Sequence, residues 1–293
     1  MSISIKFNLV MLLVFAVGFG AATVLVENIL VENAKDEVAL KASIMMAAAK
    51  SMRSYTVEEI RPLLRQLDTE DFLPQTVPAY AATENMKRLR KFYPDYSYKE
   101  AVLNPTNPEH KAAAWEEDII QYFRNYEDVK EYSGVRSTPT GQYLFLSRPF
   151  KITKEGCLSC HSTPDVAPES MVKKYGLNNG FGWKHNEIVG AQIVNVPMTI
   201  PLARADETFK FFMIILGGVF AAIWMVLNLL LYLIIIKRIN NIAKNADEIS
   251  QGNMAVAEFD IKGKDEVASL GHSFNLMYRS LSSAVKLLDK TQS

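Results

Sequence analysis

An excess of charge of either sign is missing from this chain, which carries 32 basic and 32 acidic residues among 293. Without a basic surplus nothing favours binding to nucleic acid, and we expect no such partner. Charge is also missing locally, between residues 7 and 26 and again between residues 211 and 236. Each run is long enough to cross a hydrocarbon core of about 30 Å as a helix. The sequence therefore predicts two membrane spans over these runs.

Each apolar run has an alternative interpretation. The first contains small residues between Gly18 and Ala22 that resemble the cleavage site of a signal peptide. Its apolar stretch continues past them to Val26 and resumes at Ile29 and Leu30, which favours an uncleaved anchor. The second run would otherwise be a buried core helix, but its apolar side chains cover every face, which favours a span.

Positive charge lies on the terminal side of both runs, since Lys6 precedes the first and Lys237 and Arg238 follow the second. Such residues favour the cytoplasmic side of a membrane. We therefore expect a multi-pass protein of a bacterial inner membrane with both termini inside. The predicted parts are a cytoplasmic N-terminus (1–6), the two spans (7–26 and 211–236), an extracytoplasmic, periplasmic domain (27–208) and a cytoplasmic tail (237–293).

Glycine and proline are nearly absent from residues 27–67, which are rich in Ala, Met, Lys and Glu. This composition predicts a long helix that continues out of the first span. Residues 68–130 combine short helices with proline-bearing turns. Aromatic and β-branched residues then predict a hairpin over residues 134–152 and a further strand over residues 187–196. The expected fold class of the outer domain is α+β, with an antiparallel sheet.

Cysteine is scarce, and the only two thiols occur in Cys157-Leu-Ser-Cys160-His161. Two cysteines separated by two residues and followed at once by histidine are the attachment signature of a c-type haem. The two thiols bond the two vinyl groups of one porphyrin, and the adjacent imidazole lies under the iron as its proximal ligand. We therefore expect one covalent haem c held by Cys157 and Cys160, with His161 as the metal ligand.

Three other uses of the motif explain less of it. A structural disulfide suits an oxidising compartment but requires neither the tight spacing nor His161. A tetrahedral zinc site lacks its second Cys/His pair. A thioredoxin-like motif usually opens a helix after a strand and does not need the histidine.

The second axial ligand stays open. A thiolate is excluded because no third cysteine exists. Thioether ligation is common in c-type haems, yet methionines at helical spacing usually fill cores and a lone loop histidine is usually solvated. Water or no ligand would leave the iron open to small molecules. The candidates are Met45, Met46, Met52, His110 and His185, besides water or an empty position.

Cations and aromatic side chains near the motif have two interpretations each. Arg148 and Lys151 either pair with haem propionates or form an ordinary polar strand end, and the second interpretation is slightly favoured. The aromatic residues either form apolar walls around the haem or fill the domain core. These residues are Tyr143, Phe145, Phe181 and Trp183.

Several short motifs are distributed over residues 35–205. They are Met52-Arg53-x-Tyr55-Thr56, the stretch from Tyr98 to Pro108, Ala114-Trp-Glu116, Arg148-Pro149, Cys157-Leu-x-Cys-His161 and Tyr175-Gly-x-x-x-Gly-Phe-Gly-Trp183. Together they resemble the PAS-like periplasmic haem-c domain family, formerly a domain of unknown function. The resemblance implies a PAS-like sheet with flanking helices, haem attachment at Cys157 and Cys160, and His161 as axial ligand.

Beyond Lys237 apolar residues follow a heptad-like pattern in two blocks, separated by a connector with Gly252 and Gly263. Two short helices cannot bury such stripes alone, so we expect a parallel four-helix bundle completed by a second copy of the chain. The tail resembles a HAMP domain, with Arg238 where that family often has proline. A plain coiled-coil dimerisation tail is the alternative. The stripe residues are Ile239, Ile242, Ala246, Ile249, Val267, Leu270, Phe274, Met277, Leu281, Ala284 and Leu288.

A haem domain and a HAMP domain in one chain favour a redox or gas sensor, in which a change at the iron is carried to the bundle. Because no kinase, cyclase or methyl-accepting region follows the stripes, we expect output through a separate, unidentified partner protein. The alternative is a membrane-tethered electron-transfer cytochrome with a single haem, for which the tail only dimerises. An enzyme such as a haem peroxidase is not expected, because no acid/base constellation lies near the motif.

Overall fold

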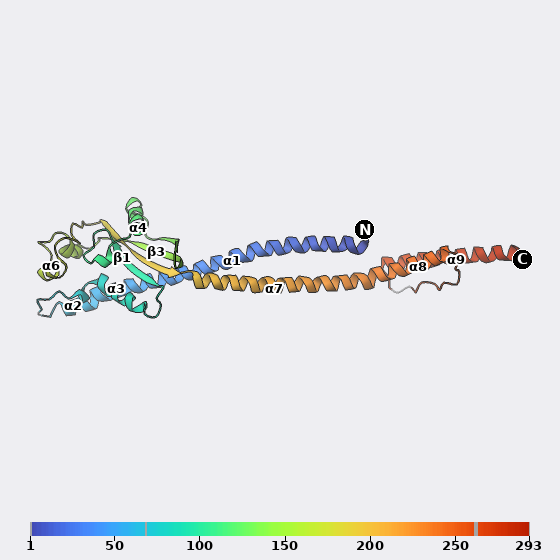
Figure 1. Ribbon diagram of the computed structural model, residues 1–293, viewed down its shortest axis with the longest axis horizontal. Coiled ribbons are helices and arrows are strands. Elements are labelled where there is room, and N and C mark those ends of the chain that lie inside the picture. Colours follow the sequence, from blue (N-terminus) through green and yellow to red (C-terminus); the bar gives the residue numbers. More distant parts are fainter. Residues whose placement is uncertain (1, 68, 261–262, 293) are drawn as a thin grey trace. The chain divides into compact units, whose positions relative to one another are not determined.

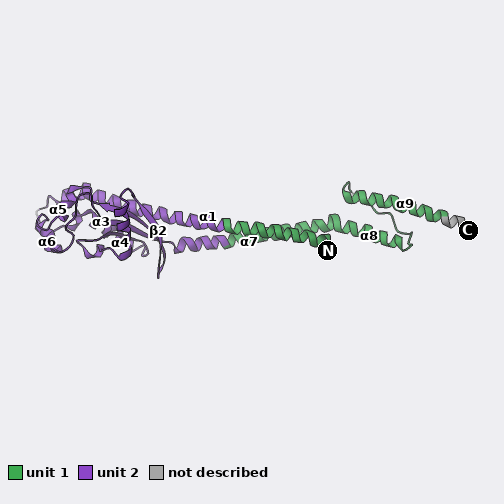
Figure 2. Cartoon of the chain, turned by 90° about the horizontal axis from the view of Figure 1, so that it is seen from above, with its two compact units in different colours: residues 1–25, 210–293 green, residues 26–209 purple. Residues whose placement is uncertain are grey.

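The computed structural model describes residues 2–67, 69–260 and 263–292, with side chains described up to residue 287. Within this range the chain forms two compact units (Figure 2). One unit comprises residues 26–209, and the other combines residues 1–25 with residues 210–293. The unit of residues 26–209 has nearly the bounds of the predicted outer domain.

Helices and strands follow one another as drawn in Figure 1. In chain order they are α1 (Ile3–Tyr55), the π-helical turn η1 (Thr56–Ile60), α2 (Arg61–Leu64), η2 (Pro74–Thr76), α3 (Pro78–Leu89), β1 (Ser97–Val102), η3 (Pro108–His110), α4 (Ala114–Asn125), β2 (Tyr132–Thr138), β3 (Gly141–Lys151), η4 (Glu155–Cys157), α5 (Leu158–His161), α6 (Glu169–Tyr175), β4 (Ile188–Pro197), α7 (Thr199–Leu230), the π-helical η5 (Leu231–Ile236), α8 (Lys237–Ser250) and α9 (Glu266–Gln292).

The helix predicted over residues 27–67 is confirmed as far as Leu64, because α1 runs on through η1 into α2. In η1 the hydrogen bonds widen to a π-helical turn, which shifts the phase of the residues that follow. Thr56 is buried at the start of this turn, and its hydroxyl donates to the Met52 carbonyl at 2.8 Å. Residues after η1 therefore present a different face from the one that regular α-helical periodicity gives.

The four strands form one antiparallel sheet in the order β1-β4-β3-β2. β2 and β3 are the predicted hairpin, and β4 is the strand predicted over residues 187–196. The α+β class with an antiparallel sheet is confirmed. Strand β1 shows that the expectation of only helices and turns between residues 68 and 130 was wrong. The sequence does not reveal this strand because Lys99 and Glu100 interrupt its apolar pattern.

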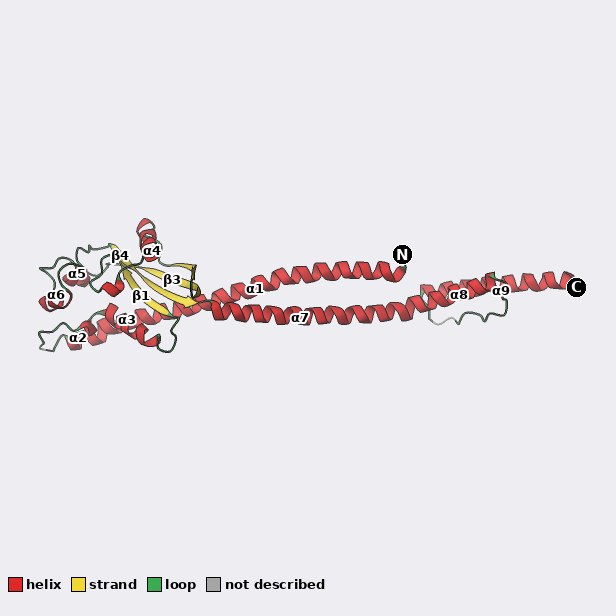
Figure 3. Cartoon of the chain, viewed as in Figure 1, coloured by secondary structure: helices red, strands yellow, loops and turns green. Residues whose placement is uncertain are grey.

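Helices α1 and α4 cover opposite faces of the sheet (Figure 3). On β3, Leu144 and Leu146 pack with residues of α1, whereas Phe145 between them packs with α4. This is the alternation that the two-residue period of a strand imposes. Burial of these two apolar layers is the main term that stabilises the domain.

The junction between β4 and α7 is a single residue. Met198 lies between Pro197, which ends the strand, and Thr199, which begins the helix. Its side chain is buried in the α1 layer, and its N–H donates to the Gln142 carbonyl at 2.9 Å. The last strand therefore passes into α7 without a flexible loop.

Two helices of the described chain are long and apolar enough to cross a membrane, Ile3–Leu64 and Thr199–Ser250. Side chains such as Leu12 and Ile214 are 67% and 74% exposed. Surfaces of this kind are stable when lipid covers them. A membrane protein with two candidate spans is thereby supported, and the limits of the spans stay predictions.

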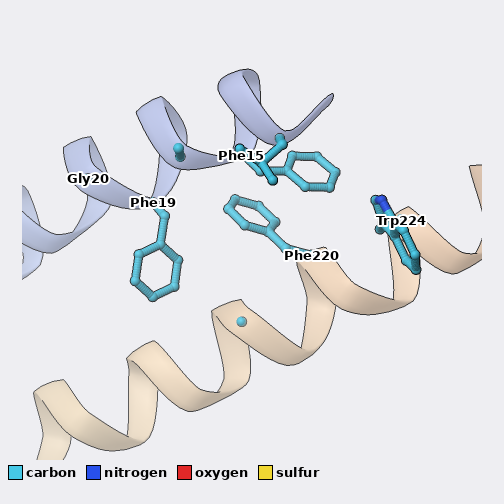
Figure 4. Close-up of a pocket in the computed structure, with 8 residues that line it drawn as sticks. Phe15, Phe19, Gly20, Phe220 and Trp224 are labelled. Carbon is cyan, nitrogen blue, oxygen red and sulfur yellow. The ribbon is translucent and has the colours of Figure 1, made fainter. Parts of the chain in front are cut away.

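The two candidate spans contact each other through aromatic and amide side chains. Phe15 stacks on Phe220 with 4.8 Å between ring centroids, and Asn8 and Asn228 exchange two amide hydrogen bonds of 2.9 and 3.0 Å. Such amide pairs hold helices together in hydrocarbon. Figure 4 shows the apolar groove of about 570 Å³ beside this contact, where the side chain of Trp224 forms part of the wall.

Each predicted stripe of the tail contributes to one small core. Ile242 and Ile249 on α8 are buried together with Phe274 on α9. Other stripe residues remain exposed in a single chain, as a half-bundle requires. They are Ala284 and the larger Leu270, Met277 and Leu281, which are 51%, 59% and 42% exposed. Leu288 lies outside the residues with described side chains.

Arg238 lies within one continuous helix, since α7 runs through η5 into α8. A proline at this position would break or kink the helix, so the continuity agrees with the presence of arginine instead. Its guanidinium pairs with the Asp265 carboxylate at 2.5 Å, and Asp265 also accepts from the Ala268 N–H at 2.8 Å. The side chain of Asp265 thus connects the start of α9 to α8.

Candidate functional site

The Cys-x-x-Cys-His segment follows β3 and folds as the turn η4 and the short helix α5. Backbone hydrogen bonds close these two short elements, from Cys157 N–H to the Lys154 carbonyl and from Ser162 N–H to the Leu158 carbonyl. Both cysteines are free and half-buried. The disulfide alternative is therefore not realised.

The motif packs on a small apolar core at the end of the sheet. Cys157 and Leu158 contact this core, as do the rings of Phe150 and Trp183. Its buried members are Val102, Ile152 and Val189. The core holds the first thiol at a fixed place relative to β3 and β4.

The imidazole of His161 is fixed on two sides. Its Nδ1 lies 2.7 Å from the carbonyl oxygen of Gly180, and its face stacks on the indole of Trp183 with 4.0 Å between centroids. The Trp183 N–H also donates to the His161 carbonyl at 3.1 Å. An imidazole that donates Nδ1–H to a carbonyl presents Nε2 as its lone pair, which is the usual arrangement of a metal-ligating histidine.

Burial lowers the pKa of His161, and the hydrogen bond to the Gly180 carbonyl opposes this to a smaller extent. A lowered pKa keeps the imidazole neutral around pH 7. The neutral ring is the form that binds a metal ion. The environment of His161 therefore suits ligation.

Position 180 requires glycine. Its φ is +87°, and a Cβ there would meet the Thr106 hydroxyl and lie 2.8 Å from the Thr106 Cα. Asn104 binds the same point, since its Oδ1 accepts from the Gly180 N–H and its Nδ2 donates to the Phe181 carbonyl, both at 3.2 Å. The turn after β1 thus holds the carbonyl that orients His161.

A line of side chains joins α1 to His161. The Arg53 guanidinium lies over the Phe150 ring at 5.2 Å, and Phe150 meets Trp183 edge-on at 6.0 Å. Trp183 in turn stacks on His161. His161 is therefore linked to α1 through three successive ring contacts.

Arg53 is held by a buried ion pair. Its Nη1 lies 2.5 Å from the carboxylate of Glu100, which is only 2% exposed. The Tyr98 hydroxyl donates to the same carboxylate at 2.7 Å, and burial raises the pKa of Tyr98 well above its ordinary value. A buried carboxylate with two such partners is strongly destabilised when either partner is removed.

The candidate sixth ligands are not brought together. Met45 and Met46 are buried in the α1 layer among strand residues, so they fill the core. His185 is exposed. His110 is half-buried, its Nδ1 atom is buried without a hydrogen-bond partner in the described chain, and burial lowers its pKa. Met52 is half-buried on α1, next to Arg53 in the sequence.

The cations and aromatic residues predicted near the motif divide between two roles. Arg148 pairs with Glu131 and Lys151 with Glu127, each at 2.8 Å, so both serve as polar strand ends. Phe145 belongs to the core on the α4 face, and Tyr143 pairs with Pro197 at the other end of β3. Trp183 alone packs on His161, while the backbone of Phe181 is bound by Asn104.

Sequence reasoning does not single out Gly180, Asn104 or Arg53, although each lies in a motif stretch of the family resemblance. Their roles depend on contacts between segments far apart in the chain, such as the 76 residues between Asn104 and Gly180. The only local sign of the role of position 180 is the glycine itself, because a positive φ favours glycine. The motif identifies the reactive atoms but not the groups that hold them.

The donor set suits a porphyrin better than a bare metal ion. No group of three or more His, Cys, Asp or Glu side chains in the described residues is arranged to hold a metal. One oriented imidazole with two free thiols next to it matches a ring that supplies four ligands itself. The residues present therefore fit a c-type haem.

Fold and site together define a membrane protein whose α+β domain carries a Cys-x-x-Cys-His site and whose tail is a pair of heptad-bearing helices. Residues 31–197 match the family model Tll0287-like, and residues 230–283 match that of the HAMP domain. The first match spans more than half of the chain. The chain belongs to the Tll0287-like family and carries a HAMP domain, which confirms the family resemblance.

Among solved structures, the cyanobacterial haem protein Tll0287 aligns with 55% of this chain and 95% of its own. The two are 17% identical, with a TM-score of 0.42, which is too low to support an argument. None of the curated proteins matches this chain at a significant level.

Proposed function

We propose that this chain binds one haem c through Cys157 and Cys160, with His161 as proximal ligand, and acts as a membrane sensor that signals through its HAMP domain. The observation that carries the proposal is the fixed imidazole. His161 directly follows the second thiol, and its Nδ1 is held by the Gly180 carbonyl, so Nε2 is left to ligate. Membership of the Tll0287-like family supports a haem as the ligand.

The residues of the motif divide the chemistry between them. Each thiol adds its sulfur and its hydrogen across one vinyl double bond, so attachment needs no oxidant. Trp183 and the Gly180 carbonyl keep the His161 ring in one orientation. When bound, haem iron supplies electron transfer or the binding of small molecules.

A route from the site to the tail is available through the chain itself. His161 contacts α1 by way of Trp183, Phe150 and Arg53. The same sheet passes through Met198 into α7, which continues into α8 of the HAMP domain. A change of ligation or redox state at the iron shifts an equilibrium only if it favours one of two arrangements of these helices. We propose that the HAMP core provides those arrangements.

The HAMP stripes support a parallel homodimer, because the exposed residues of α9 need a second copy to cover them. Two candidate spans and a HAMP domain fit an inner-membrane protein. We propose that the haem domain lies on the periplasmic side and that the tail acts on a separate cytoplasmic partner. The chain itself is proposed to be no enzyme.

Covalent attachment is tested on full-length protein made with c-type maturation. Haem should stay on the denatured chain, with a two-thioether pyridine haemochrome spectrum. Cys157→Ala or Cys160→Ala should leave one thioether or none, whereas Ser159→Ala between them should keep both. Release of free haem from wild-type protein into acidic acetone would contradict the proposal.

Sensing is tested in membranes that contain cysteine variants of the HAMP core, Ile242→Cys and Phe274→Cys. Cross-linking rates should differ between oxidised and reduced membranes, or with and without nitric oxide, carbon monoxide or oxygen. The difference should vanish when His161→Ala is added. Equal rates in all states, with fast electron exchange at a ligand-insensitive iron, would favour the electron-carrier function instead.

A further inference from the structure

Asn104 binds the backbone on both sides of the carbonyl that contacts His161. Its Oδ1 accepts from the Gly180 N–H, and its Nδ2 donates to the Phe181 carbonyl, both at 3.2 Å. The peptide group between these two residues carries the Gly180 carbonyl oxygen, which lies 2.7 Å from Nδ1 of His161. Asn104 therefore fixes the orientation of this peptide group through the two peptide groups that flank it.

The peptide group that follows Gly180 needs such a restraint. Residue 180 has a φ of +87° and no Cβ, so its own backbone offers little resistance to rotation. Half a turn of the peptide group would aim the Phe181 N–H at His161 in place of the Gly180 carbonyl. The restraint thus decides whether the imidazole faces a hydrogen-bond acceptor or a donor.

The two orientations favour different tautomers of the neutral imidazole. A carbonyl only accepts, so it keeps the proton of His161 on Nδ1 and leaves a lone pair on Nε2. A backbone N–H only donates, so it would favour the proton on Nε2, which then could not bind a metal. The Thr106 hydroxyl, 3.5 Å from Nδ1, can donate or accept and therefore selects neither tautomer.

The Asn104 side chain is exposed, but the loop between β1 and η3 fixes the backbone that carries it. The Leu103 N–H donates to the Val189 carbonyl of β4 at 3.2 Å, and Lys111 Nζ donates to the Leu103 carbonyl at 2.6 Å. Pro105 is buried and restricts the backbone of the residue before it. The amide of Asn104 is thus presented to residues 180 and 181 from a fixed support.

We infer that Asn104 is a positioning residue for the haem, because it selects the tautomer of His161 that leaves Nε2 free to bind iron. The inference rests on the proposed function and deepens it. A carbonyl held at Nδ1 also makes the imidazole more basic. A more basic ligand stabilises ferric iron, so Asn104 also keeps the reduction potential low.

The test compares Asn104→Leu with Asn107→Leu in the full-length chain. Asn107 lies in the same loop, where its Oδ1 accepts from the Glu109 N–H at 3.1 Å, so its variant disturbs the loop without freeing the peptide group at Gly180. The first readout is the nitrogen NMR shifts of His161 in haem-free chain, at about pH 8, where the imidazole is neutral. The second is the midpoint reduction potential of the holoprotein.

Wild-type chain should hold the proton of His161 on Nδ1. Asn104→Leu should move proton population to Nε2 and raise the reduction potential, whereas Asn107→Leu should change neither. If Asn104→Leu does not fold, Asn104→Asp is measured instead. Aspartate keeps the acceptor for the Gly180 N–H but loses the donor to the Phe181 carbonyl, so the nitrogen shifts should move in the same direction.

Wild-type nitrogen shifts in a folded Asn104 variant would overturn the inference. Equal changes in Asn107→Leu would overturn it too, because they would show general damage to the loop. A wild-type chain that takes up no covalent haem would instead overturn the proposed function, and the two failures are distinguishable because the nitrogen shifts are measured without haem.

Discussion

The imidazole of His161 and the indole of Trp183 lie nearly parallel, with planes 12° apart and centroids separated by 4.0 Å. The stack fixes the plane of the ring, while the hydrogen bond from Nδ1 to Gly180 fixes its rotation within that plane. Together they determine the direction of Nε2 before any ligand is bound. Preorganisation of this kind reduces the entropy lost on ligation.

Trp183→Leu should therefore weaken the bond between His161 and the iron while leaving both thioethers intact. The expected signal is a larger high-spin fraction in the absorption spectrum of the haem-loaded protein. Trp115→Leu is the matched control, because Trp115 packs against Phe145 in the α4 layer. Equal spectra for the two variants would contradict a role of the indole in ligation.

Gly180→Ala should destabilise the domain and disturb His161, because position 180 combines a φ of +87° with close approach to Thr106. Backbone strain of this kind is worth about 1–3 kcal/mol, and the clash adds to it. Gly176→Ala separates the two effects, since Gly176 has a φ of +82° with open space around it. Denaturant unfolding should show a larger loss for Gly180→Ala, and only that variant should change the haem spectrum.

His110 should make the stability of the domain depend on pH. Burial lowers its pKa below the ordinary value of 6.5, so below that pH the unfolded chain binds a proton that the folded chain does not. The free energy of unfolding should then fall as the pH falls below 6.5, by at most about 1.4 kcal/mol per pH unit, and this loss is absent above it. His110→Gln should flatten the profile, whereas the exposed control His185→Gln should keep the wild-type slope.

The exposed stripe of α9 should form the contact between two copies. Leu270→Cys should cross-link chain to chain in membranes, because Leu270 is 51% exposed at a predicted core position of the bundle. Ser269→Cys is the neighbouring control on another face of the helix. Cross-linking at position 269 as fast as at position 270 would exclude the parallel bundle.

The sequence predicts the long helix, the hairpin and β4 because their patterns are local. It does not predict β1, since Glu100 and Lys99 occupy buried or half-buried positions of that strand. Glu100 is tolerated there because it pairs with Arg53 from α1, and Lys99 because it pairs with Glu116 from α4. Partners so distant in the chain leave no trace in hydrophobic periodicity.

The same limit applies to the site. The thiols and the imidazole are adjacent in sequence, so spacing alone identifies them. The group that orients His161 lies 19 residues further on. The π-helical turn η1 changes which residues share a face after Thr56, so α-helical periodicity does not hold across it.

The single residue between β4 and α7 has a mechanical consequence. A hinge absorbs motion through several free dihedral angles, but Met198 is buried and its N–H is bound to the Gln142 carbonyl. The joint therefore has almost no compliance. A tilt or twist of the end of β4 is passed directly to the first turn of α7 as torque.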